Sequence, residues 1–165
     1  MKRTWTGILF ILAAACLATP ALAQQQPPTT SGGSGMALLN LDNTVALHGY
    51  DPVAYFVDNR AVKGNKRLLE RIGSATYYFA SRGNRYEFLG NAPRYQPQFG
   101  GYCATSLARG RLEDINPHLF VIFDGKLYLF NNPDAEAAFL RDPRRIDYEA
   151  RQHYFRLASQ QRSTY

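Results

Sequence analysis

The sequence predicts an α+β fold of small antiparallel strands and hairpins with short helices. Two segments rich in β-type residues, 66–80 and 118–130, are each interrupted by a turn signal, Gly73-Ser74 in the first and Asp124-Gly125 in the second. Each segment is followed by a capping residue and a run with helical spacing of apolar residues. Because 45% of the residues are hydrophobic, the chain can form an ordinary core.

The two segments also resemble each other. A shift of 51 positions aligns Tyr77, Phe79, Phe88 and Leu89 with Tyr128, Phe130, Phe139 and Leu140. In both copies a strand ends in aromatic residues, a capped helix follows, and a proline comes after the helix. We therefore expect two strand–helix pseudo-repeats.

Before the first hairpin, the alternation of apolar and polar residues is less regular. Residues 39–47 alternate loosely between apolar and polar, and 48–52 contain the Gly, Asp and Pro typical of a turn. The apolar run 53–56 then predicts a strand. Strands are expected over 66–72 and 75–80 in the first hairpin, and over 118–123 and 126–130 in the second.

Capping residues predict the helix that follows each hairpin. Ser81 is expected to cap a helix reaching about Leu89, and Asn132 a helix over 133–141 that begins with a proline. Asp142-Pro143 should end this second helix.

The remaining elements are expected at the junction of the repeats and at the C-terminal end. Pro93 and Pro97 predict an irregular loop, and residues 102–109 a short helix that Gly110 terminates. A last helix is expected over 146–158, where apolar residues recur on one face.

The N-terminal segment has the pattern of a secretory signal. A positively charged start precedes the apolar stretch 7–18, which is shorter than the roughly 20 residues of a spanning helix. Ala21-Leu22-Ala23 is a small-x-small cleavage pattern. We therefore expect residues 1–23 to be a cleaved signal peptide and the protein to be periplasmic or secreted. An uncleaved anchor and a lipoprotein cut before Cys16 are the alternatives.

The rest of the chain divides by composition. Residues 24–36 are Gln, Pro, Thr, Ser and Gly and predict a flexible linker, 37–145 a folded domain, and 146–165 a C-terminal helix and tail. Cleavage after residue 23 lowers the net charge from +6 to +4, because two basic residues are lost. It also leaves Cys103 as the single thiol, so an internal disulfide is excluded.

No standard catalytic motif occurs. HExxH, CxxC, GxSxG and the nucleotide-binding fingerprint are absent, so we expect no enzyme. Because the protein is expected to be exported from the cytoplasm, a nucleic acid partner is disfavoured. The C-terminal arginines alternate with acidic residues, and at most weak contact with a membrane surface is expected from them.

Cys103 is the residue most in need of explanation. It follows Gly100-Gly101 at the start of a predicted helix, where the partial positive charge favours a thiolate. His48 and His118 lack a second ligand at metal-binding spacing, so the fold would have to assemble any site. With Cys103 they form a candidate soft Cys/His centre for copper or zinc. Two alternatives stay open, a buried packing residue and a nucleophile that needs an oriented base.

Four segments are similar to the exported (periplasmic) YHS-domain-containing protein family. They are GYDPVAYF (49–56), YYFASRGNRYEF (77–88), FGGYCA (99–104) and DGKLYLF (124–130). The resemblance spans about residues 47–143 and implies a treble-clef-like YHS domain.

The resemblance does not imply one function. In the wider group, cysteines occupy positions that are Ala54, Ala80 and Asn84 here, and none of these can ligate a soft metal. Cys103 belongs to the GGYCA motif of the exported subgroup. Two hypotheses follow for an exported small binding module. One is soft-metal (copper) binding or homeostasis through Cys103 with His48 or His118. The other is an interaction domain for a small ligand or an envelope protein, with Cys103 as packing.

Overall fold

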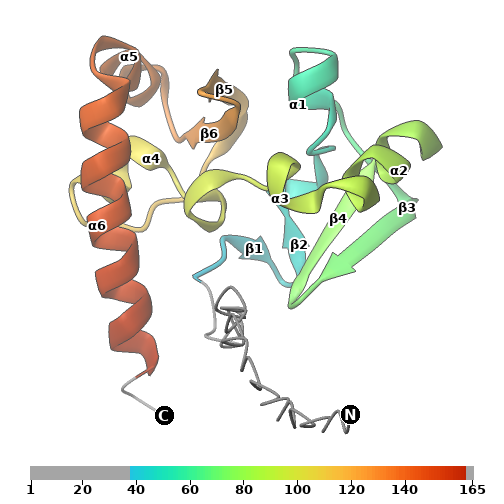
Figure 1. Ribbon diagram of the computed structural model, residues 1–165, viewed down its shortest axis with the longest axis horizontal. Helices are drawn as coiled ribbons and strands as arrows, with labels where there is room; N and C mark the ends of the chain where they lie inside the picture. Colours follow the sequence, from blue (N-terminus) through green and yellow to red (C-terminus); the bar gives the residue numbers. More distant parts are fainter. Residues whose placement is uncertain (1–37, 163–165) are drawn as a thin grey trace, which may run out of the picture. The chain divides into compact units, whose positions relative to one another are not determined.

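The α+β class predicted from the two hairpin signals is confirmed in the computed structural model, which describes residues 38–162 (Figure 1). These residues belong to one unit, Ser34–Tyr165. The expected signal peptide (1–23) and linker (24–36) lie outside the described residues. In Figure 1, β1 to β4 and α1 to α3 lie on one side, and β5, β6 and α4 to α6 on the other.

Pairs of strands alternate with groups of helices along the described chain, and α6, with 20 residues, is much longer than the other helices. The first half contains β1 (Leu41–Asp42), β2 (Val45–Ala46), the 3-10 turn η1 (Leu47–Gly49), α1 (Ala54–Val57), β3 (Asn65–Ile72), β4 (Ala75–Phe79), α2 (Arg82–Gly90) and α3 (Ala92–Tyr95). The second contains η2 (Gln98–Gly101), α4 (Ala104–Ala108), β5 (Asn116–Phe123), β6 (Lys126–Phe130), α5 (Pro133–Arg141) and α6 (Pro143–Arg162). The order of the larger sheet is β1-β2-β4-β3, with only the β2–β4 pair parallel, and β5 and β6 form an antiparallel pair.

The two hairpins have the same strand register, 51 residues apart. β3 and β4 pair Asn65 with Phe79 and Ile72 with Ala75, while β5 and β6 pair Asn116 with Phe130 and Phe123 with Lys126. Both have an irregularity after the first of these pairs. The caps match as well, since Ser81 Oγ accepts from the amide of Asn84 and Asn132 Oδ1 from that of Ala135. The repeat seen in the sequence is therefore a repeated structural unit.

The repeat extends to the turns ahead of each hairpin. Three consecutive residues of η1 have φ between 50° and 78°, and three of η2 have φ between 55° and 87°. Each triplet is followed by an extended tyrosine, Tyr50 or Tyr102. Asp51 and Cys103 come next, and both are fully buried. The two halves therefore place a carboxylate and a thiol at equivalent positions.

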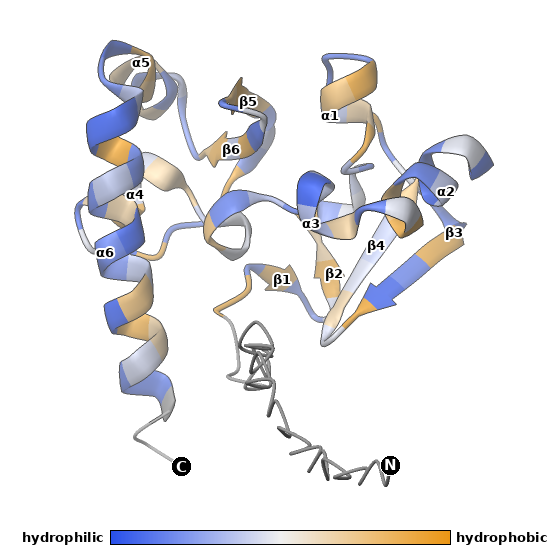
Figure 2. Cartoon of the chain, in the orientation of Figure 1, coloured by the Kyte–Doolittle hydropathy of each residue, from blue (hydrophilic) through white to orange (hydrophobic). Residues whose placement is uncertain are grey.

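The buried aromatic rings also repeat. The ring centroids of Phe79 and Phe88 are 5.1 Å apart, and those of Phe130 and Phe139 are 5.2 Å apart. Each hairpin thus packs on its own helix through a similar pair of rings, which accounts for the buried face of α2 and of α5. Figure 2 shows α6 as hydrophilic along most of its length, with hydrophobic residues at intervals.

The prediction of a strand over residues 53–56 was wrong, because Val53 lies in a turn and the three residues after it belong to α1. Asp51 Oδ1 accepts a hydrogen bond from the amide of Val53 at 2.9 Å, and Pro52 has a φ suited to a first helical turn. This local cap directs the apolar run into a helix.

Three other boundaries differ from the expectation. The segment expected as an irregular loop contains α3, and α6 extends from Pro143 to Arg162, beyond the expected 146–158. Cys103 is the N-cap of α4 and so precedes the first turn. Among residues 38–162, no helix combines the length and apolar character needed to cross a membrane.

The turn η2 packs against residues 38–40, which lead into β1. Gly100 has a φ of +63°, and a Cβ on it would lie 1.9 Å from the carbonyl oxygen of Leu38. The amide of Asn40 donates to Gly100 O at 2.9 Å, and its side-chain amide donates to Gly101 O at 3.1 Å. The contact is between two backbones, so only glycine fits at position 100.

We expect Gly100→Ala to lower the free energy of unfolding by about 3 kcal/mol or more, because it adds a backbone clash to a left-handed conformation. Gly125→Ala is the matched control, since Gly125 has a φ of +69° and a Cβ on it would meet nothing within 4 Å. That variant should lose only the roughly 1 kcal/mol of left-handed strain. Urea unfolding of both variants makes the comparison, and equal losses would contradict a steric role for Gly100.

Candidate functional site

Cys103 lies in a closed hydrogen-bond network below the surface. Its Sγ is 3.2 Å from Ser106 Oγ and 3.4 Å from Asn131 Oδ1. The Ser106 hydroxyl also lies 2.7 Å from Glu113 Oε2. Hydrogen bonding from Ser106, together with Arg111 and Asn131, lowers the pKa of Glu113, so that this carboxyl is an anion at neutral pH. The thiol therefore has protein partners and no access to solvent.

His48 is held by a different carboxylate. Its Nε2 lies 2.9 Å from Asp114 Oδ1, which also accepts from the side-chain amide of Asn40 at 2.8 Å. Burial alone would raise the pKa of Asp114, but hydrogen bonds from Asn40, the Ile115 amide and His48 together lower it. The pair connects η1 to the segment ahead of β5.

His118 contacts neither of the other predicted ligands through a hydrogen bond. Its Nε2 lies 3.1 Å from the hydroxyl of Tyr50, and the two rings meet edge to face at 5.3 Å. Within residues 38–162, no group of three or more His, Cys, Asp and Glu side chains is placed to hold a metal ion. Cys103, His48 and His118 are thus not gathered into one site. The copper or zinc centre stays a prediction that requires Cys103 to leave its network.

Ala54, Ala80 and Asn84, the positions expected to be cysteines in the wider YHS group, lie around Asp51. Asp51 Oδ2 accepts from the amide of Ala80 and from the side-chain amide of Asn84, each at 2.7 Å, and Ala54 is buried in the helix that follows. With the amide of Val53, the carboxylate has three N–H donors. This cluster is a structural tie between α1, the end of β4 and α2.

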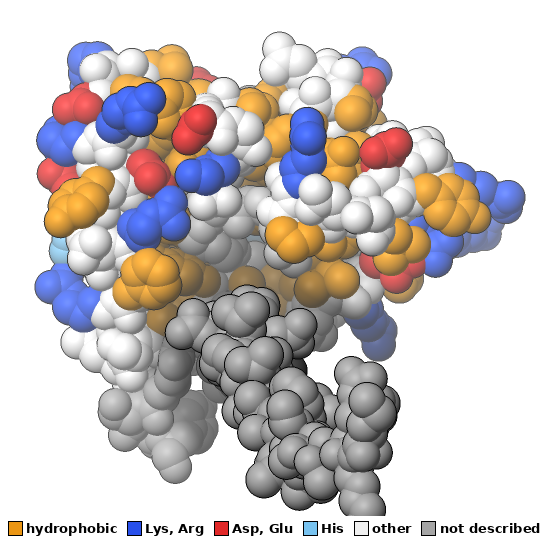
Figure 3. Space-filling view, viewed as in Figure 1, with side chains coloured by type: hydrophobic (Ala, Val, Ile, Leu, Met, Phe, Trp, Pro, Cys, Tyr) orange, Lys and Arg blue, Asp and Glu red, His pale blue; other side chains and the backbone are white. Residues whose placement is uncertain are grey.

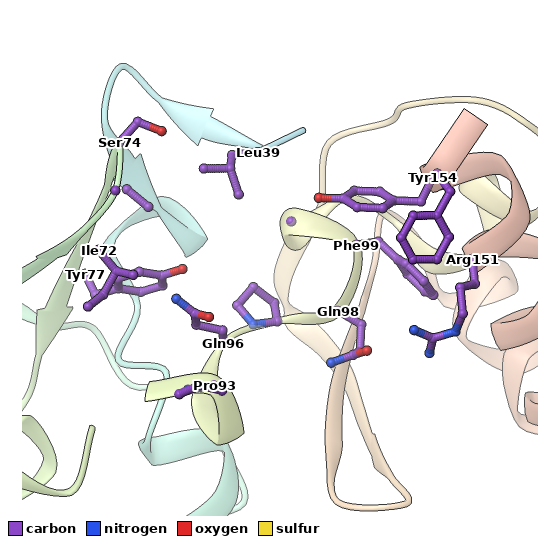
Figure 4. A pocket seen from close by; sticks show the side chains of 15 residues that line it. Leu39, Ile72, Ser74, Tyr77, Pro93, Gln96, Gln98, Phe99, Arg151 and Tyr154 are labelled. Carbon is purple, nitrogen blue, oxygen red and sulfur yellow. The ribbon is translucent and has the colours of Figure 1, made fainter. Parts of the chain in front are cut away.

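A cavity of about 650 Å³ lies between the β3–β4 turn, the α3–η2 segment and α6 (Figure 4). We call it the groove. It is lined by Leu39, Ile72, Gly73, Ser74, Ala75, Tyr77, Pro93, Gln96, Pro97, Gln98, Phe99, Gly100, Arg151, Tyr154 and Phe155. Sequence reasoning missed it because these residues come from four segments far apart in the chain, and no local pattern indicates that they meet.

Aromatic rings form much of the wall of the groove. The centroid of Phe99 lies 6.0 Å from that of Tyr154, whose hydroxyl donates to the carbonyl oxygen of Leu38 at 2.8 Å. Burial raises the pKa of Tyr77 to about 12, so this phenol is neutral at physiological pH. These hydroxyls therefore serve as hydrogen-bonding groups and carry no charge.

Arg151 is the one cation among the described residues that line the groove. Its Nη2 lies 2.8 Å and 3.2 Å from the two carboxylate oxygens of Asp147, and its guanidinium lies 5.8 Å from the ring centroid of Phe99. One nitrogen of the guanidinium thus serves to orient the group. Its other N–H donors are not involved in the pairing with Asp147.

Comparison of the chain with family models, with curated proteins and with solved structures found no match.

We expect the Cys103 thiol to react slowly with Ellman's reagent in the native protein and at the rate of a free thiol in concentrated urea, because burial blocks attack. The measurement is the absorbance of the released thiolate, followed over time in both conditions. The full chain also contains Cys16, so Cys103→Ala serves as the reference from which the signal of Cys103 is obtained by difference. Rapid labelling of Cys103 in the native state would contradict the closed network.

Proposed function

We propose that the protein is a small binding module and that its ligand is a small amphipathic molecule held in the groove. The observation that carries this proposal is a cavity of about 650 Å³ with aromatic walls and a few polar side chains. Small-molecule sites commonly have volumes of roughly 300–1,000 Å³ and this kind of lining. An apolar ring or chain of the ligand would lie against Tyr77, Phe99 and Phe155.

The polar end of the ligand is expected to be an anionic group. Arg151 has N–H donors beyond the nitrogen that pairs with Asp147, and Gln96 and Gln98 add amide groups to the same cavity. A carboxylate or sulfonate accepts such charge-assisted hydrogen bonds well. The ligand class is therefore an apolar body with one acidic group.

The lining favours binding over catalysis. Among the described residues that form the groove, none is Cys, His, Asp or Glu. Thiol chemistry needs a cysteine, and the tyrosines of the lining are weak general acids and bases at neutral pH, because burial raises the pKa of Tyr77 and of Tyr154. Retention of a ligand needs only shape, apolar contact and hydrogen bonds, all of which the lining offers.

The proposed binding module is an exported protein and a relative of exported YHS-domain proteins. Both statements rest on sequence motifs, namely the signal pattern of residues 1–23 and the four segments between 49 and 130. The metal hypothesis is less well supported, because Cys103 is buried among protein partners and lies outside the groove.

The fluorescent probe 1-anilinonaphthalene-8-sulfonate tests the groove, since it combines aromatic rings with one sulfonate. We expect saturable fluorescence enhancement with the purified protein, and Phe155→Ser should weaken probe binding about fivefold or more, because it removes a ring from the wall.

Tyr148→Ser is the matched control for this experiment. Tyr148 is also an exposed aromatic residue of α6, 64% exposed against 62% for Phe155, but it does not line the groove. Its replacement should leave probe affinity unchanged. Equal weakening by both variants, or no saturable binding by the wild type, would contradict the groove as the site.

A further inference from the structure

The outward face of α6 carries arginine and aromatic side chains in alternation. Arg144, Tyr148, Arg151 and Phe155 are spaced by four, three and four residues, which places them on one side of a helix. Tyr148 and Phe155 are among the most exposed large hydrophobic residues of the described chain, at 64% and 62%. Figure 3 shows hydrophobic, basic and acidic side chains mixed over this part of the surface. We call these four residues the arginine–aromatic face.

The acidic residues of α6 lie beside this face and not on it. Asp147 pairs with Arg151, and Glu149 pairs with Arg145. Over residues 141–162 the sequence has six arginines against three acidic residues. Arg144 has no carboxylate partner among the described residues, and its guanidinium lies over the Phe123 ring at 5.8 Å. Because Asp147 offsets the charge of Arg151, the positive charge of the face comes from Arg144, and two large rings of the face are exposed to solvent.

This combination fits one kind of partner. Aromatic rings are favoured at the boundary between headgroups and acyl chains, and arginines are attracted to anionic lipid headgroups. An isolated pair of exposed rings would favour any apolar partner, but the net positive charge around them selects a negatively charged surface.

We propose that α6 docks the protein on an anionic lipid surface through the arginine–aromatic face. The helix lies along the surface, with Tyr148 and Phe155 at the level of the headgroups and Arg144 on the lipid phosphates. Arg151 and Phe155 also line the groove, so that the groove opens at the docked face. The docking itself does not depend on the proposed ligand.

Co-sedimentation with vesicles tests the docking, using phosphatidylcholine alone and phosphatidylcholine mixed with phosphatidylglycerol. We expect the wild type to bind the anionic vesicles more tightly than the neutral ones, with an affinity that falls as salt rises. The variant Tyr148→Ser/Arg144→Gln should bind anionic vesicles about tenfold more weakly. Neither residue lines the groove, so this result is separate from the test with the fluorescent probe.

The matched control is Tyr86→Ser/Lys66→Gln. Tyr86 is 65% exposed on α2 and Lys66 is exposed on β3, so this variant loses the same charge and the same kind of ring on another surface. It should bind anionic vesicles like the wild type. All variants share the N-terminal segment, whose contribution to vesicle binding therefore cancels in the comparison.

Three results would overturn the proposal. They are equal loss of vesicle binding in the two double variants, no preference of the wild type for anionic vesicles, and binding to polyglutamate without binding to vesicles. The last would indicate an acidic protein as the partner. Circular dichroism of each variant establishes that it is folded, since both double variants replace exposed side chains only.

Discussion

The close approach of Gly100 to Leu38 is the contact on which the groove depends. This contact packs η2 against residues 38–40, which lead into β1, and two hydrogen bonds from Asn40 hold η2 there. Phe99, in a left-handed conformation at φ 55°, is thereby directed between the rings of Tyr128 and Tyr154, at 6.0 Å from each. A side chain at position 100 would separate the two backbones, and with them two walls of the groove.

The fold is a repeat whose two copies differ in the helix that follows the capped helix. Asn91 and Asp142 have nearly the same backbone angles and begin equivalent helices, but α3 ends after four residues, whereas α6 continues for 20. Tyr95 packs against Phe56 in the first copy, and α6 packs on α4 in the second. The extension of α6 supplies both the second wall of the groove and the arginine–aromatic face. The proposed binding and docking sites thus both use the part of the second copy that the first lacks.

The sequence predicts those parts of the fold that depend on local signals. Sequence patterns predicted the hairpins, the helix caps at Ser81 and Asn132 and the repeat, because turn and cap residues act on their neighbours in the chain. The helix at 54–57 was missed, because the apolar run 53–56 has the composition of a strand and the Asp51 carboxylate that caps it is held in place by the distant Ala80 and Asn84. The groove was missed too, since its walls come from distant segments. Cys103, His48 and His118 were grouped by chemistry, and the structure gives each of them a different partner.

In the proposed function, the groove binds an apolar molecule with one acidic group. The most direct measurement is a nuclear magnetic resonance titration of the isotopically labelled protein with decanoate, which has an alkyl chain and a carboxylate. We expect the largest changes in amide chemical shift at residues 96–100 and 151–155, around the groove. Changes centred instead on Cys103, His48 or His118, or no saturable change at all, would contradict the proposed function.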